Sequence, residues 1–212
     1  MNLRTITSLL LTGTVLLGAA ETSRAVIVSI GTQHFGNGQT NIGSGTYNTA
    51  VAAQPSPFNG FLGGDVAGPD FDATWIFTYS SVPTVSGASL TIGLYDGDFA
   101  TTGTQLSLLS IDGNNITGLA SLIFEAGPGA TNQYGVYEIA LPASVYASLQ
   151  DGSATIHMTL ATGGGILGPT SNNGAGIDFA ILSVQVPEAG PGMLVCLGGA
   201  ALAARRRRCA KS

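Results

Sequence analysis

Apolar and polar residues alternate along three short stretches of this chain. In residues 71–79 the aromatic side chains occupy every second position, and threonine or aspartate fills most of the positions between them. Residues 88–95 and 153–161 alternate in the same way. Because successive side chains of a strand point to opposite faces, a period of two predicts that each stretch is a half-buried β-strand.

Five further stretches are rich in β-branched and aromatic residues and are bounded by turn sequences such as Asp-Gly, which also predicts strands. These stretches are residues 26–30, 47–52, 105–111, 134–141 and 177–186. Helix is predicted only for residues 143–149, because Pro142 suits the first turn of a helix and apolar side chains of this stretch can share one side.

Eight short strands and one small helix predict an all-β fold for residues 26–186. An antiparallel two-sheet β-sandwich of the jelly-roll type accommodates these strands in one domain. Residues 31–68 are rich in glycine, asparagine, threonine and proline, so we expect early edge strands joined by long loops there. The sequence has no repeat of fixed period, which argues against a propeller or a solenoid.

The predicted domain has a one-sided charge. Residues 26–186 contain eight aspartates, two glutamates and no lysine or arginine, so their formal charge is −10, against −5 for the whole chain of 212 residues. A segment without such cations cannot hold nucleic acid or an anionic membrane by charge. Both cysteines, Cys196 and Cys209, lie beyond the domain, so we expect neither a disulfide nor a thiol nucleophile within it.

Residues 1–25 have the pattern of a signal peptide. Arg4 precedes a mostly apolar run at residues 9–20, and small residues stand at the two positions that signal peptidase recognises, Ser23 and Ala25. We predict cleavage after Ala25, with cleavage after Ala20 as an alternative. An uncleaved anchor is a further alternative, although the run is shorter than the roughly 20 residues of a spanning helix. The chain is therefore expected to be exported.

The C-terminal 27 residues combine three features in a fixed order. The sequence Val186, Pro187, Glu188 is followed by an uncharged, largely apolar stretch at residues 192–204 and then by a basic cluster of Arg205, Arg206, Arg207 and Arg208. The apolar stretch would make a helix of about 20 Å, against a hydrocarbon core of about 30 Å. The positive-inside rule would keep the arginines in the cytoplasm and the domain outside.

This order resembles the PEP-CTERM sorting signal of exported Gram-negative bacterial proteins, with a departure at Ala189, where that family usually has a second proline. The resemblance implies processing near the motif by an exosortase, which is a membrane-embedded cysteine protease. It also implies a place at the cell surface or in the extracellular matrix, with exopolysaccharide as a partner. The alternative is an ordinary short C-terminal membrane anchor, and both interpretations predict a surface protein.

Aspartates supply the candidate metal ligands. A buried carboxylate without a cation nearby must be hydrogen-bonded, protonated or bound to metal. Asp178 stands in an otherwise apolar strand, a pattern similar to the last strand of calcium-stabilised jelly-roll carbohydrate-binding modules. Asp72, Asp96 and Asp98 lie near glycine-containing turns and offer the hard oxygen ligands that Ca²⁺ prefers. These four residues predict a structural calcium site; the alternative is that they cap turns through backbone N–H groups.

No pattern of catalytic residues stands out, so we predict a non-enzymatic surface protein. His34 and His157 lie beside no nucleophile motif, and nothing in the sequence selects a pair of carboxyl groups for glycoside hydrolysis. A carbohydrate-binding module is the alternative function, and a secreted hydrolase is less favoured. Sugar binding would call for exposed aromatic side chains that stack on sugar rings, and the candidates are Trp75, Tyr79, Tyr95, Tyr134 and Tyr137. Trp75 alternates with other aromatic residues and is expected in the core.

Overall fold

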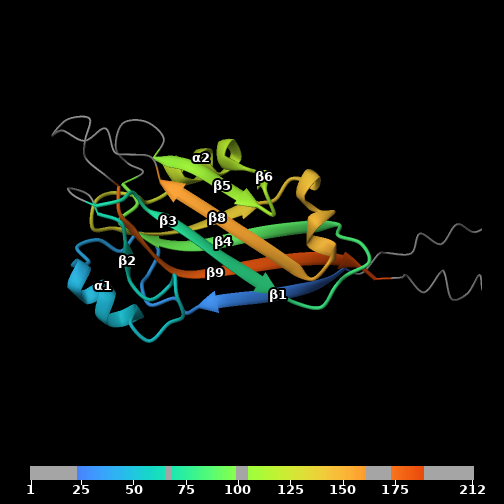
Figure 1. The fold of residues 1–212 in the computed structure, drawn as a ribbon, viewed down its shortest axis with the longest axis horizontal. Helices are drawn as coiled ribbons and strands as arrows, with labels where there is room; N and C mark the ends of the chain where they lie inside the picture. The colour runs from blue at the N-terminus through green and yellow to red at the C-terminus, as the bar shows by residue number, and fades with distance from the viewer. Residues whose placement is uncertain (1–22, 65–67, 99–104, 161–172, 189–212) are drawn as a thin grey trace, which may run out of the picture. The chain divides into compact units, whose positions relative to one another are not determined.

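Two antiparallel sheets form the domain, and the computed structural model describes it over residues 23–64, 68–98, 105–160 and 173–188 (Figure 1). The first sheet has the order β1-β9-β4-β7, and the short strand β2 pairs with the beginning of β9. Its strands are β1 (Ser23–Gly31), β2 (Phe61–Leu62), β4 (Gly87–Tyr95), β7 (Tyr134–Ala140) and β9 (Ala175–Pro187). The second sheet has the order β3-β8-β5-β6. Its strands are β3 (Asp72–Thr78), β5 (Leu106–Ile111), β6 (Asn114–Asn115) and β8 (Ser153–Leu160).

The strand order is that of a jelly roll. When β2 is left out, the first sheet contains the first, eighth, third and sixth of the remaining strands, and the second contains the second, seventh, fourth and fifth. Two sheets that exchange strands in this way are the double Greek key of jelly-roll sandwiches. The structure therefore confirms the predicted all-β, antiparallel two-sheet fold.

The main core lies between the two sheets and follows from the alternation in the sequence. In β3 the side chains of Ala73, Trp75 and Phe77 are buried, while the four residues between and beside them are exposed. They pack with inward side chains of the other strands, such as Ile92 and Ile156, in one continuous cluster. The expectation that Trp75 belongs to the core is correct.

A second, smaller core covers the outer face of the first sheet. Here the segment of residues 32–62 packs its apolar side chains against residues of β4, β7 and β9. The buried members are Phe35, Ile42, Tyr47, Val51, Tyr95, Tyr134 and Phe179. The rings of Tyr47 and Tyr95 stack with centroids 4.5 Å apart. The first sheet is thus buried on both faces at this end.

Helical segments differ from the sequence prediction in three places. Residues 47–52, predicted as a strand, belong to helix α1 (Ser44–Val51), whose buried Tyr47 and Val51 are four residues apart and so lie on one side of the helix. Helix α2 (Thr117–Ala126) was not predicted; its Phe124 packs on Tyr137 of β7. In place of one helix at 143–149 there are two short 3₁₀ turns, Ala143–Val145 and Ser148–Gln150.

The two ends of the described domain lie side by side. Strands β1 and β9 pair along the whole of β1, from Ser23 opposite Pro187 to Gly31 opposite Phe179 (Figure 1). Both strands extend slightly beyond the predicted domain limits of 26 and 186. In the described ranges no helix has the length and apolar character needed to span a membrane. The apolar run of the predicted signal peptide, the stretch 192–204 and the arginine cluster lie outside the described residues.

Candidate functional site

A β-bulge in strand β9 places Asp178 on the outer side of the first sheet. The pairing of β4 with β9 shifts here, because Gly93 lies opposite Phe179 but the next residue, Leu94, lies opposite Ile177. Asp178 is the additional residue between them. A bulge interrupts the alternation of a strand and redirects a side chain, so both Asp178 and Phe179 take part in contacts with the outer segment of residues 32–62.

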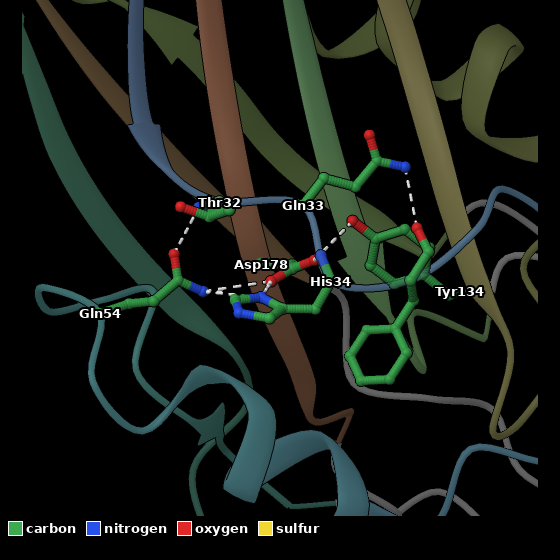
Figure 2. A network of polar contacts seen from close by, with 7 residues as sticks. Thr32, Gln33, His34, Gln54, Tyr134 and Asp178 are labelled. Atoms are coloured by element: carbon green, nitrogen blue, oxygen red, sulfur yellow. Dashed lines mark hydrogen bonds and ion pairs between the residues drawn. The ribbon is translucent and has the colours of Figure 1, made fainter.

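The carboxylate of Asp178 is completely buried and accepts four hydrogen bonds (Figure 2). Oδ1 accepts bonds from His34 Nδ1 at 2.7 Å and from Gln54 Nε2 at 3.1 Å. Oδ2 accepts bonds from the backbone N–H of His34 at 2.7 Å and from the Tyr134 hydroxyl at 2.9 Å. An ionised carboxylate offers about four lone-pair positions, and each position here has a donor.

Gly31 brings the chain over the bulge and into this network. It has a φ of +77°, and a Cβ at this position would lie 2.4 Å from the carbonyl oxygen of Asp178 and 2.7 Å from Gln54 Oε1. That same Gln54 oxygen accepts a hydrogen bond of 2.6 Å from the backbone N–H of Thr32. Glycine is therefore required where β1 ends, because only a backbone without a side chain fits so close to both groups.

Two buried tyrosines have pKa values that the charge of Asp178 raises. Burial raises the pKa of the Tyr134 hydroxyl above its ordinary value, and the charge of Asp178 and the hydrogen bond to it raise it further. Burial also raises the pKa of Tyr47, and the charges of Asp178 and Tyr95 add to that effect. Both hydroxyls therefore stay protonated. Tyr134 uses its proton to bind Asp178, whereas the Tyr47 hydroxyl has no hydrogen-bond partner among the described residues.

His34 is held in one orientation by these contacts. Because a carboxylate only accepts hydrogen bonds, Nδ1 of His34 carries a proton, so the tautomer that this contact selects has its lone pair at Nε2. The side chain is 29% exposed, and none of the described residues forms a hydrogen bond with Nε2. This tautomer is the one that an imidazole base or metal ligand uses. In this structure the His34 side chain attaches the outer segment of residues 32–62 to the first sheet.

A second Asp–His pair lies on the outer face of the second sheet. His157 Nε2 of β8 is 2.9 Å from Asp72 Oδ1 of β3, and the Asp72 side chain is 68% exposed. The strand register places Asp72 opposite Thr159 and Thr74 opposite His157. This pair has the same two residue types as the first one but lies in water. It provides a natural comparison for the effect of burial.

The four aspartates predicted as calcium ligands do not converge. Asp178 and Asp72 belong to the two pairs above, in different sheets. Asp96 Oδ1 accepts the backbone N–H of Asn132 at 2.6 Å, and Asp98 Oδ1 accepts the Thr131 hydroxyl at 2.9 Å. Over the residues that the structure describes, no three His, Cys, Asp or Glu side chains form a metal-binding group. The calcium site stays a prediction.

The aromatic residues considered for sugar stacking do not form an exposed platform. Their side chains are buried in the cases of Trp75, Tyr95, Tyr134 and Tyr137. Tyr79 is partly buried and donates its hydroxyl to the carbonyl oxygen of Leu149 at 2.7 Å. Tyr134 was predicted only as a candidate for sugar stacking, and the contacts of His34, Gln54 and Tyr47 at this site were not predicted. A usable indication was that the two histidines are the only side chains between residues 26 and 186 that can become cations.

Comparison with known proteins gives only distant likenesses. No protein-family model matches the chain, and no curated protein matches its sequence. A β-porphyranase of glycoside hydrolase family 86 from Bacteroides plebeius is 16% identical over 62% of this chain, with a TM-score of 0.35. Dimeric latent PorU from Porphyromonas gingivalis is 10% identical over 82% of it, with a TM-score of 0.39. The chain spans 20% and 14% of the lengths of these two proteins.

A smaller solved structure is also similar over most of its length. It is a family 35 carbohydrate-binding module from Clostridium thermocellum, 14% identical, covering 77% of this chain and 98% of the module, with a TM-score of 0.31. Likenesses this low assign neither a ligand nor an activity to the chain.

Proposed function

We propose that this chain is an exported, non-enzymatic protein of the cell surface or extracellular matrix. It is sorted by its PEP-CTERM-like C-terminus and retained with exopolysaccharide. The observation that supports this proposal best is the pairing of Ser23 with Pro187. It brings the end of the predicted signal peptide and the beginning of the sorting motif to the same end of the sandwich. Both processing enzymes, signal peptidase and exosortase, act at the membrane, so both cuts would be made at one end of the folded domain.

The opposite end of the same strands carries the buried network. Strand β1 has nine residues, which correspond to a length of about 27 Å. It begins beside Pro187 and ends at Gly31, next to Asp178. The segment of residues 32–62 therefore begins at the end of the paired strands that is opposite Pro187. The acidic composition of residues 26–186 suits a surface in contact with water and with uncharged or cation-bridged polysaccharide.

The test follows the full chain in a Gram-negative host that carries an exosortase and in the same host without it. We expect the protein at the cell surface only in the first host, with an intact mass that lacks Arg205 to Ser212. Replacing Glu188 by Gln should reduce surface delivery, whereas replacing the exposed Glu125 of α2 by Gln should leave it unchanged. Surface delivery that is equal in both hosts would overturn sorting by an exosortase and leave an ordinary membrane anchor.

A further inference from the structure

Among the described strands, only β1 pairs with the last two residues of β9. Strand β4 accompanies β9 only as far as Gly87, which lies opposite Gln185. Beyond that point β1 continues, with Arg24 opposite Val186 and Ser23 opposite Pro187. Among the described strands, β1 is therefore the only partner of the first two residues of the sorting motif.

The predicted signal-peptide cut falls within this pairing. Cleavage after Ala25 removes Ser23, Arg24 and Ala25 from β1. Gln185 would keep its place, because it still lies opposite Gly87 and its carbonyl oxygen accepts the backbone N–H of Ser86 at 2.9 Å. Val186 and Pro187 would lose the one strand partner that they have among the described residues. Cleavage after Ala20 would leave that partner in the mature protein.

We propose that β1 masks the sorting motif until signal peptidase cuts after Ala25. Cleavage near the motif by the exosortase would then require the earlier cut by signal peptidase. In this step water hydrolyses the Ala25–Val26 peptide bond, the hydroxyl goes to the Ala25 carbonyl carbon and the proton goes to the Val26 nitrogen. Proteins that bind extended peptides do so by pairing with free backbone groups of the strand. While Ser23 and Arg24 are present, they occupy that edge of Val186 and Pro187. This inference rests on the proposed function.

The test changes the N-terminal cut in the full chain and measures removal of the tail. Ala25→Leu places a large side chain where signal peptidase needs a small one, so the cut moves to Ala20 and the product begins at Glu21. Ala25 is exposed, so the domain tolerates this change. We expect tail removal to slow by about fivefold or more, because each net strand hydrogen bond lowers the open fraction by about fivefold. Ala20→Leu, which leaves only the cut after Ala25, is the matched control and should process at the wild-type rate.

A rescue variant separates masking from other effects of Ala25→Leu. Replacing both Ser23 and Arg24 by proline in that background removes the strand N–H that faces β9, because adjacent residues point their N–H groups to opposite sides. Pulse-chase and intact mass at both termini should show tail removal restored. Wild-type rates in Ala25→Leu, or a wild-type product that begins at Glu21 and still loses its tail, would overturn the masking. If no variant loses its tail, the proposed sorting fails and the masking fails with it.

Discussion

His34 Nδ1 lies 2.7 Å from Asp178 Oδ1, and the two residues are 144 positions apart in the chain. The contact joins the segment that follows β1 to a bulge in the last strand. Asp178 also accepts a bond from Gln54, so both halves of the outer segment, before and after α1, are attached to the same carboxylate. One buried carboxylate thus attaches the outer segment of residues 32–62 to the first sheet at two points.

Replacing Asp178 by Asn should destabilise the domain strongly. The amide keeps the shape of the carboxylate, but its NH₂ group replaces an oxygen that accepts hydrogen bonds, so two donors would face each other. The substitution also removes the charge that His34 and Tyr134 bind. We expect the free energy of unfolding, measured by urea denaturation, to fall by about 3–5 kcal/mol. Asp72→Asn removes the exposed pair with His157 and should cost less than about 1 kcal/mol. Equal losses in the two variants would show that the buried network contributes no special stability.

The four hydrogen bonds of Asp178 argue against its predicted role as a calcium ligand. All four acceptor positions of Asp178 already have protein donors, so a Ca²⁺ ion bound to this carboxylate would have to displace one of them. We therefore expect the difference in melting temperature between wild type and Asp178→Asn to be the same in millimolar Ca²⁺ and in chelator, at matched ionic strength. A Ca²⁺-dependent increase in the wild type that Asp178→Asn abolishes would establish the calcium site instead.

The sequence predicted the sheets well because their information is local. The period of two in residues 71–79 and 153–161 corresponds to β3 and β8, and the burial of every second residue follows directly. The need of Asp178 for a polar partner was also predictable from its apolar surroundings. The identity of that partner was not, because a bulge breaks the alternation at this residue and His34 is distant in sequence. The prediction of a strand at residues 47–52 was wrong, because it relied on β-branched and aromatic content and not on the helical spacing of Tyr47 and Val51.

Alkaline pH should unfold the domain through its buried tyrosines. Burial raises the pKa values of Tyr47, Tyr134 and Tyr137 above the ordinary 10.0, and it raises that of the less buried Tyr79 to about 12. The folded state then retains protons that the unfolded state loses. Stability is therefore complete below about pH 10 and decreases as the pH rises, by about 1.4 kcal/mol per pH unit for each deeply buried tyrosine.

The check is the free energy of unfolding from about pH 9 to about pH 12, together with the absorbance of ionised tyrosine. Tyr137→Phe, which removes a hydroxyl bonded to the Pro128 carbonyl oxygen, should make the slope shallower by one proton. A slope that is unchanged in this variant would contradict the assignment of Tyr137 as a contributor.

The hydroxyls of Tyr134 and Tyr47 should respond differently to removal. Tyr134→Phe deletes a 2.9 Å hydrogen bond to a buried charge and should lower the free energy of unfolding by about 1.5–3 kcal/mol. Tyr47→Phe deletes a buried hydroxyl for which the described part of the chain supplies no hydrogen-bond partner, so stability should be unchanged or should increase by up to about 1 kcal/mol. Because both rings are fully buried and remain in place, the comparison isolates the hydroxyl groups. A loss in Tyr47→Phe as large as that in Tyr134→Phe would indicate that Tyr47 has a partner in solution.

A last prediction concerns Gly93, which makes room for the outer core. A Cβ on this residue would lie 2.2 Å from the Tyr134 hydroxyl oxygen and 2.4 Å from the ring of Phe179, so neither ring could keep its place. We expect Gly93→Ala to lower the free energy of unfolding by about 1–3 kcal/mol, the usual cost of overpacking. Gly118 near the beginning of α2 has no atom within 4 Å of its Cβ position, and Gly118→Ala should stabilise the domain by about 0.5–1 kcal/mol through helix propensity.

Since Tyr134 binds Asp178, the loss in Gly93→Ala should also become smaller when Asp178 is already Asn, and a double-mutant cycle measures this coupling. Additive losses would mean that the aromatic cluster and the buried carboxylate stabilise the outer segment independently.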